Sequence, residues 1–172
     1  MQNLAKVGDM IIDSDQINVI LKIENDLVFF GPLIKDTNVG KSEIICSIPV
    51  DNFSKAGIRF LLTKDEVKAF LKDLTTQKPL NIPIYTNKNN NSLKEYLYLN
   101  NPTKTGQLLI FLDQRQKDIP LSKFDQIIFD QAINHLAEEI AAVNQTDLEV
   151  AKKQILSSLS KNTQPDTLIA NA

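Results

Sequence analysis

The chain has 172 residues, of which 42% are hydrophobic and 23% charged, with a formal net charge of −2 and a pI near 5.4. This length suits one domain or two small ones, each with enough apolar residues for a core. No apolar run approaches the roughly 20 residues that span a bilayer, and the N-terminus lacks the apolar core of a signal peptide. We therefore expect a cytoplasmic protein with no contact to membranes.

Charge is distributed unevenly along the chain. Residues 78–117 hold six basic and two acidic side chains, whereas the residues from 118 onward hold four basic and eight acidic ones. A modest basic surface in the middle of the chain would suit contact with nucleic acid. An ordinary solvated mixture of charges accounts for the same counts equally well.

Residues 6–60 are predicted to form four or five short antiparallel strands. The odd-numbered residues from 17 to 23 are all apolar and alternate with mostly polar ones, so we expect the odd-numbered side chains to face a core. Asn25 and Asp26 follow and predict a tight hairpin turn. Short strands at this spacing indicate a small curled sheet or partial barrel.

A helix with a clearly marked start follows these strands. Thr63 and Glu66 have the spacing of a capping box, in which each side chain accepts a hydrogen bond from an open backbone amide. The apolar residues after them recur at helical spacing, so one face of the helix must lie on an apolar surface. The nearest such surface in the sequence is the strand-rich segment, and we therefore expect this helix to close the β domain.

The second half of the chain is predicted to be helical. Residues 76–92 contain two prolines and an asparagine-rich run without sustained periodicity, which indicates a linker or irregular lead-in. Helices are expected over 93–99, 103–113 and 123–143 and after residue 146, with a polar break at 114–120. Capping signatures begin the last two helices, and Glu138 and Glu139 fall on the polar side of the longest one. Residues 93–159 should form a compact bundle, and residues 160–172 a disordered tail.

The sequence offers little that supports catalysis. His135 is the only histidine and Cys46 the only cysteine, so neither has the several convergent partners that a metal site or a catalytic triad requires. The expected roles are a surface or interface histidine and a small half-buried strand cysteine. Glu138 and Glu139 are adjacent and project about 100° apart on a helix, which does not make a carboxylate pair. We expect a protein that is not an enzyme and uses no metal or cofactor.

Several stretches, in this order, carry a resemblance to a known family. They are KVGD at residues 6–9, IPVDN at 48–52, GIR at 57–59, TKDEVKAFLKDL at 63–74, LSKFDQIIFDQAINHLAEEIA at 121–141 and TDLEVAKKQIL at 146–156. Together they resemble the CarD-like (CdnL) family of transcription regulators over roughly residues 5–159. The N-terminal module of that family is shared with the RNA polymerase-interacting domain of the transcription-repair coupling factor.

The resemblance implies an α+β protein that regulates bacterial transcription without catalysis. A Tudor-like domain over residues 1–75 would dock on the β subunit of RNA polymerase, largely through a strand edge. The helical domain over residues 93–159 would contact promoter DNA at the upstream edge of the transcription bubble, where a tryptophan of the family wedges into the minor groove. The resemblance implies a monomer and no cofactor. It places the polymerase contact at Ile23, Asn25, Leu27 and Ser47, and the DNA contact at Tyr85, Lys88 and Lys94.

The sequence departs from the family where DNA and polymerase contacts matter. It contains no tryptophan, and Tyr85 is the aromatic nearest the expected wedge, although a tyrosine packed on its own domain is the simpler interpretation. Ser47 stands where relatives commonly carry an arginine, and Arg59, which matches the GIR motif, is expected to have a structural role. Two alternatives therefore stay open: a protein-interaction module on the same scaffold with a different partner and no DNA binding, and an unrecognised enzyme.

Overall fold

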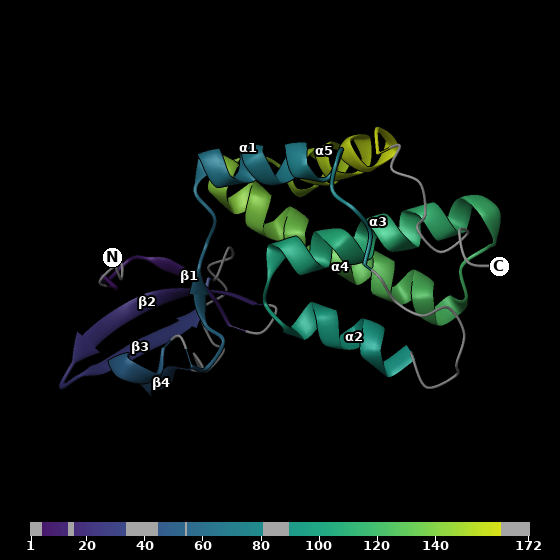
Figure 1. Cartoon of the computed structure of the whole chain (residues 1–172). Helices are drawn as coiled ribbons and strands as arrows, with labels where there is room; N and C mark the ends of the chain where they lie inside the picture. Colours follow the sequence, from purple (N-terminus) through teal and green to yellow (C-terminus); the bar gives the residue numbers. More distant parts are fainter. Residues whose placement is uncertain (1–4, 14–15, 34–44, 54, 81–89, 163–172) are drawn as a thin grey trace, which may run out of the picture. The chain divides into compact units, whose positions relative to one another are not determined.

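The computed structural model describes residues 5–13, 16–33, 45–53, 55–80 and 90–162, with the side chains of residues 90–92 excepted. The chain divides into two compact units, which we call the sheet unit (Met1–Leu61) and the helical unit (Leu62–Ala172). Strands precede helices along the chain, so the expected α+β class is confirmed (Figure 1).

The described residues of the sheet unit form one antiparallel sheet of five short strands. The strand order is β4-β3-β2-β1-β5, and a single 3-10 turn, η1, follows β4. The expected run of short antiparallel strands is therefore present. The bounds are β1 Met10–Asp13, β2 Gln16–Glu24, β3 Leu27–Pro32, β4 Cys46–Pro49, η1 Val50–Asn52 and β5 Arg59–Phe60.

The hairpin between β2 and β3 turns at the two residues that the sequence predicted. Asn25 and Asp26 have φ values of 49° and 61°, and Glu24 pairs with Leu27, so the loop has two residues. Positive φ at both loop residues matches the twist of the flanking strands, and asparagine and aspartate tolerate it better than most side chains do. The predicted tight turn is confirmed.

The side of β2 that faces the core differs from the expectation. Ile20 is 1% exposed and Asn18 is 5% exposed, whereas Leu21 is 43% and Ile23 is 37% exposed. The pairing register shifts between Ile20 and Lys22, which marks a β-bulge at this point. The expected odd-numbered core face was wrong up to the bulge, because Ile20 makes both faces of the strand apolar and the even-numbered Asn18 and Ile20 are the buried residues. After the bulge, Ile23 lies on the core face opposite Val28, as expected, although its side chain is 37% exposed.

Within its described residues, the helical unit has five helices around one core (Figure 1). Val67, Phe70 and Leu74 of the capped helix lie in this core, together with residues of the later helices. The capped helix therefore belongs to the helical unit, and the division falls after Leu61 rather than after residue 75. The bounds are α1 Lys64–Asp73, α2 Asn90–Tyr98, α3 Pro102–Asp118, α4 Lys123–Asn144 and α5 Leu148–Ser160.

The helix starts were predicted with mixed success. The capping box is present, because the Thr63 amide donates to a Glu66 carboxylate oxygen at 2.7 Å and the Glu66 amide donates to Thr63 Oγ1 at 3.2 Å. Ser122 likewise caps α4 by accepting from the backbone of the third residue of the helix. The capping signature of Thr146 and Glu149 was wrong. α5 begins at Leu148, and the side chain of its N-cap residue, Asp147, accepts no hydrogen bond from the first turn of the helix. α3 continues through the expected polar break to Asp118.

The expected linker and tail are partly built into the helical unit. Leu80 is 7% exposed in the helical core, and α2 begins at Asn90, inside the expected 76–92 linker. Asn162 is 5% exposed and donates to the carbonyl oxygens of Leu74 at 2.8 Å and Gln77 at 3.0 Å. The predicted disorder was therefore wrong for residues 160–162, while residues 163–172 lie outside the described part.

Buried charge also departs from the simple helical pattern. Glu139, expected on the solvent side of α4, is 1% exposed, and its carboxylate accepts a hydrogen bond from the Leu62 amide at 2.8 Å. Asp125 is 3% exposed and pairs with Arg115 at 3.3 Å. A buried carboxylate requires such partners because burial without them is costly.

In the described part of the chain, no helix combines the length and apolar character that crossing a membrane would demand.

Candidate functional site

β4 forms one edge of the sheet and is the first candidate for a binding surface. It pairs only with β3, through Phe30 with Cys46, Phe29 with Ser47 and their neighbours. Among the described residues, no strand pairs with the opposite side of β4. Unpaired backbone donors and acceptors on an edge strand can accept an added strand from a partner protein.

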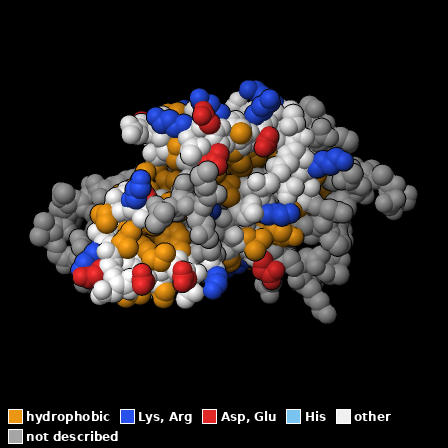
Figure 2. Space-filling view, turned by 60° about the vertical axis from the view of Figure 1, so that its left-hand side comes forward, with side chains coloured by type: hydrophobic (Ala, Val, Ile, Leu, Met, Phe, Trp, Pro, Cys, Tyr) orange, Lys and Arg blue, Asp and Glu red, His pale blue; other side chains and the backbone are white. Residues whose placement is uncertain are grey.

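The residues of this edge carry no charge, and most of them are apolar. Ile45, just before β4, is 54% exposed, and Val50, just after it, is 43% exposed. Between them, Cys46, Ser47 and Pro49 are exposed and carry no charge. Figure 2 shows hydrophobic side chains gathered over the part of the molecule that the strands form. We call residues 45–50 the β4 edge; it could bury apolar side chains of a partner as well as bind its backbone.

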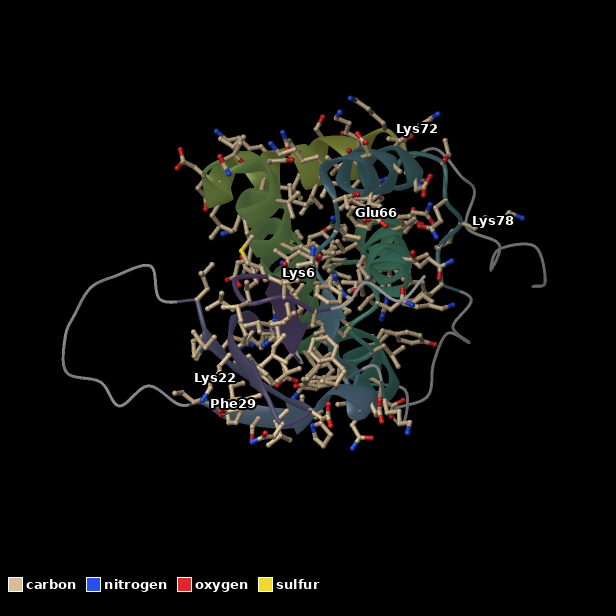
Figure 3. The ribbon with its side chains drawn as sticks, turned by 90° about the vertical axis from the view of Figure 1, so that its left-hand side faces the viewer. Lys6, Lys22, Phe29, Glu66, Lys72 and Lys78 are labelled. Carbon is tan, nitrogen blue, oxygen red and sulfur yellow. The ribbon has the colours of Figure 1, made fainter. Side chains whose placement is uncertain are left out.

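The strand register assigns each side chain near the β4 edge to one of two faces. Val28 and Phe30 point into the core of the sheet unit, so the residues beside them in β3 point to the outer face. Phe29 lies on that outer face between Lys22 and Ser47, and Figure 3 shows Lys22 and Phe29 near each other. The outer face thus joins the β4 edge to the neighbouring strands.

The structure brings together only some of the predicted polymerase-binding residues. Leu27 and Ser47 share the outer face, at the strand pairs Leu27 with Pro49 and Phe29 with Ser47. Ile23 pairs with the buried Val28 and therefore belongs to the opposite face. Asn25 lies in the hairpin turn and is exposed. The four residues share one region of the sheet but do not form one continuous surface.

The exposed apolar residues Ile45 and Val50 were missed by sequence reasoning. Each lies at an end of β4, where a strand pattern predicts an ordinary core residue. Their exposure follows from β4 being at the edge of the sheet, and strand order cannot be read from the alternation of apolar residues. The uncharged stretch from residue 45 to residue 50 was the available signal.

The end of the sheet next to the hairpin turn is acidic. The Asp26 carbonyl accepts from the Val50 amide at 2.9 Å, which holds the turn against η1 and its residue Asp51. Glu24 is nearby in β2 and is ion-paired with Lys22. These four charged side chains sum to −2. A partner at the β4 edge would therefore meet negative charge at this end, which favours basic residues on the partner.

Two of the family-like motifs have structural roles in the sheet unit. In KVGD, the Lys6 amide donates to the Asp9 carboxylate at 2.8 Å, and Gly8 has a φ of 91°. The glycine permits a turn that few other residues would adopt without strain. In GIR, Arg59 Nη1 donates to the Phe60 carbonyl at 3.1 Å. The Arg59 bond is to the adjacent residue, so the structural role expected for Arg59 stays a prediction. Neither motif lies at the β4 edge.

The second candidate surface, for DNA, is only partly within the described residues. Tyr85 and Lys88 lie outside them. Lys94 is exposed on α2, and its Nζ atom is 6.0 Å from the centroid of the Tyr98 ring, which is 56% exposed. This is the outer limit of a cation–π contact. Tyr98 was not among the predicted contacts. Its position four residues after Lys94 would have indicated that the two side chains are neighbours on one helix face.

Metal-ligating residues do not converge in the described part of the chain. No group of three or more histidine, cysteine, aspartate or glutamate side chains there could hold a metal ion. His135 is partly buried on α4, and Cys46 is exposed on β4 rather than half-buried as expected.

Comparison with known proteins adds no family assignment, because no protein-family model and no curated protein matches the chain.

Proposed function

We propose that the chain is a divergent CarD-like transcription regulator of bacterial type that binds the β subunit of RNA polymerase through the β4 edge. The observation that carries this proposal is the side of β4 that no described strand pairs with, flanked by the exposed Ile45 and Val50. The family-like motifs over residues 5–159 support it. In this proposal the curled sheet is the Tudor-like module, and the protein is cytoplasmic, monomeric and without catalytic activity.

The binding energy would come mainly from backbone pairing and apolar burial. Each added backbone hydrogen bond contributes roughly 0.5–1.5 kcal/mol net. Covering apolar surface at Ile45 and Val50 adds about 25 cal/mol for each Å² removed from water. Ser47 leaves the edge without the charge of the family's arginine. The contact should therefore depend less on arginine–carboxylate pairs than it does in relatives.

The helical unit would contribute a weaker contact to promoter DNA. Lys94 can neutralise a phosphate, together with Lys88, and Tyr85 or Tyr98 can stack on an unpaired base. A tyrosine ring is smaller than the indole of the family's wedge and would fill less of an opened base step. We therefore propose that DNA contact stabilises the open complex less than in relatives that carry the tryptophan.

A second candidate function is a protein-interaction module with a different partner and no DNA binding. The negative charge of Glu24, Asp26 and Asp51 near the hairpin favours this alternative, because the family's polymerase contact uses arginines. Such a module would use the same β4 edge and would select a partner strand that ends in basic residues.

The test is binding of the full chain to the isolated lobe of the β subunit, measured by biolayer interferometry. Ile45→Lys combined with Ser47→Lys should lower the affinity at least about tenfold, because charged side chains on an edge strand oppose strand addition. Val7→Lys is the matched control, since Val7 is an exposed apolar residue of the sheet unit away from β4. The control should bind like the wild type.

Cys46 permits a second version of the test because it is the only cysteine and is exposed. Modification with a bulky maleimide should block binding, and Cys46→Ser should bind normally and resist the reagent. Failure of the wild-type chain to bind the lobe would remove the polymerase proposal. Capture of another protein through the same edge would support the second candidate instead.

A further inference from the structure

A groove in the helical unit forms a second surface, separate from the β4 edge. α1 and α5 run side by side in this unit (Figure 1), and the groove between them has a volume of about 420 Å³. α1 contributes Leu71, and α5 contributes Val150, Lys153, Gln154, Ser157 and Ser158, followed by Lys161 directly after its end. We call this the α1–α5 groove.

The lining residues of α5 form a stripe distinct from its core face. Ala151, Ile155 and Leu159 are at most 1% exposed and pack into the helical core. The groove stripe recurs at helical spacing beside them, from residue 150 to residue 161, which is roughly 16 Å along the helix. This length suits about three turns of a partner helix or five residues of an extended segment.

The floor of the groove is apolar and its charged groups are all positive. Val150 is 43% exposed and Leu71 is half-buried, so part of the apolar surface remains open. Among the described lining residues, Lys153 and Lys161 carry the charge, and they are eight positions apart, or roughly 12 Å along a helix. Neighbouring Lys152 is paired with Glu149 at 3.1 Å. The groove therefore offers two cations around an apolar centre.

The apolar centre of the groove indicates the kind of partner. Val150 and Leu71 line the groove together with the two lysines and leave apolar surface open. A polypeptide can cover this surface with apolar side chains and can place carboxylates beside the lysines. The phosphodiester backbone of a nucleic acid has no such apolar groups. The groove thus fits a polypeptide better than it fits nucleic acid.

We propose that the α1–α5 groove binds an acidic amphipathic segment of a partner protein. The segment carries two carboxylates roughly 12 Å apart, one for Lys153 and one for Lys161, with apolar side chains between them over Leu71 and Val150. Lys161 caps the C-terminal end of α5, where its charge already offsets the helix dipole. Lys153 therefore contributes more to the binding of the segment than Lys161 does.

The experiment uses the purified full chain and a synthetic helical peptide. The peptide has two glutamates eight residues apart, to match the spacing of the lysines, with two leucines between them, and its control carries glutamines in place of the glutamates. Fluorescence anisotropy gives the affinities, and amide shifts in NMR spectra locate the contact. We expect the glutamate peptide to bind tighter and to shift the amides of Leu71 and of residues 150–161.

Variants of the chain test the charge pairing. Lys153→Gln should weaken binding about two- to fivefold, Lys161→Gln should weaken it less, and the double variant should reach about tenfold. Lys68→Gln is the control, because Lys68 is an exposed lysine of α1 that pairs with Asp65 outside the groove. It should leave the affinity unchanged.

Several results would overturn the inference. These are no binding of the glutamate peptide, equal binding of the glutamine peptide, an equal loss in Lys68→Gln, or displacement of the peptide by a short DNA duplex in the wild type but not in the double variant. None of these measurements involves polymerase, so they stand apart from the test of the β4 edge.

Discussion

Single polar residues join distant segments of the helical unit. The Asn162 side chain donates to the carbonyl oxygens of Leu74 and Gln77, and Glu139 accepts from the amide of Leu62. Each bond connects residues that are at least 77 positions apart in the sequence. Loss of such a partner leaves a buried polar group unsatisfied, at a cost of about 1–3 kcal/mol.

Gly106 shows how closely the helices of this unit approach. A Cβ atom added at Gly106 in α3 would lie 3.0 Å from Phe70 Cε2 and 3.1 Å from Leu74 Cδ2, two side chains of the packed core. Alanine gains roughly 1 kcal/mol of helix propensity over glycine, but overpacking a core costs typically 1–3 kcal/mol. We expect Gly106→Ala to lower the free energy of unfolding by about 1 kcal/mol, measured by urea denaturation.

A larger side chain should have a larger effect at the same site. Gly106→Val should destabilise more than Gly106→Ala because it adds volume next to Phe70 and is a poorer helix former. An alanine variant as stable as the wild type would show that Phe70 and Leu74 move aside without loss.

Local contacts were predictable from sequence and distant ones were not. Thr63 and Glu66 satisfy each other within three residues, so the spacing alone predicts the capping box. The Glu139 bond depends on the tertiary position of Leu62, and helical periodicity assigned Glu139 to the solvent. Gly106 gave no signal, because its close neighbours belong to a helix more than thirty positions earlier.

Among the elements, β2 provides the clearest test of the strand register. Ile20 is 1% exposed in the core of the sheet unit, while the adjacent Leu21 is 43% exposed at the bulge. Ile20→Ala should therefore lower the free energy of unfolding by about 2–4 kcal/mol, and Leu21→Ala by less than about 1 kcal/mol. Denaturant midpoints followed by circular dichroism measure both. Equal losses would contradict the assigned faces.

The candidate docking residues also show what the apolar pattern of a strand cannot predict. Alternation predicts that a strand has two faces, but it does not say which face is buried when both are apolar, as in β2. Leu27 and Ser47 fall on the outer face, whereas Ile23 falls on the other. Strand order was needed to find the edge, and with it Ile45 and Val50.

At the scale of the whole molecule, the two units have separate cores. Ile11, Ile20, Val28, Phe30 and Ile58 form that of the sheet unit, and the helical core begins at Val67. The order of strands followed by helices was predictable because the apolar period changes along the chain. The division after Leu61 was not predictable from the sequence. The apolar face of α1 could pack against the strands or against the later helices, and the sequence does not distinguish the two.

Two units with different proposed partners should be separable by mutation. Lys94→Gln and Tyr98→Ala should each shorten the lifetime of open promoter complexes about two- to fivefold, because α2 loses a phosphate contact or an exposed ring. Affinity for polymerase should stay unchanged, since both residues lie outside the sheet unit. Competition assays with heparin measure the lifetimes.

Lys104→Gln serves as the control, because Lys104 is an exposed lysine at the start of α3 rather than on α2. Unchanged lifetimes in both α2 variants would leave α2 without a role in DNA contact.

The bonds of Asn162 also set an order of events during synthesis. The last strand of the sheet ends at Phe60, so the sheet unit has all its strands soon after that residue leaves the ribosome. α1 is synthesised next. The hydrogen bonds to the Leu74 and Gln77 carbonyl oxygens cannot form until Asn162 has been synthesised, 88 and 85 residues later. During this interval, α1 therefore exposes its apolar face although the strands of the sheet have all been synthesised. Nascent chains should pass through a state in which the sheet resists proteases and α1 is cleaved.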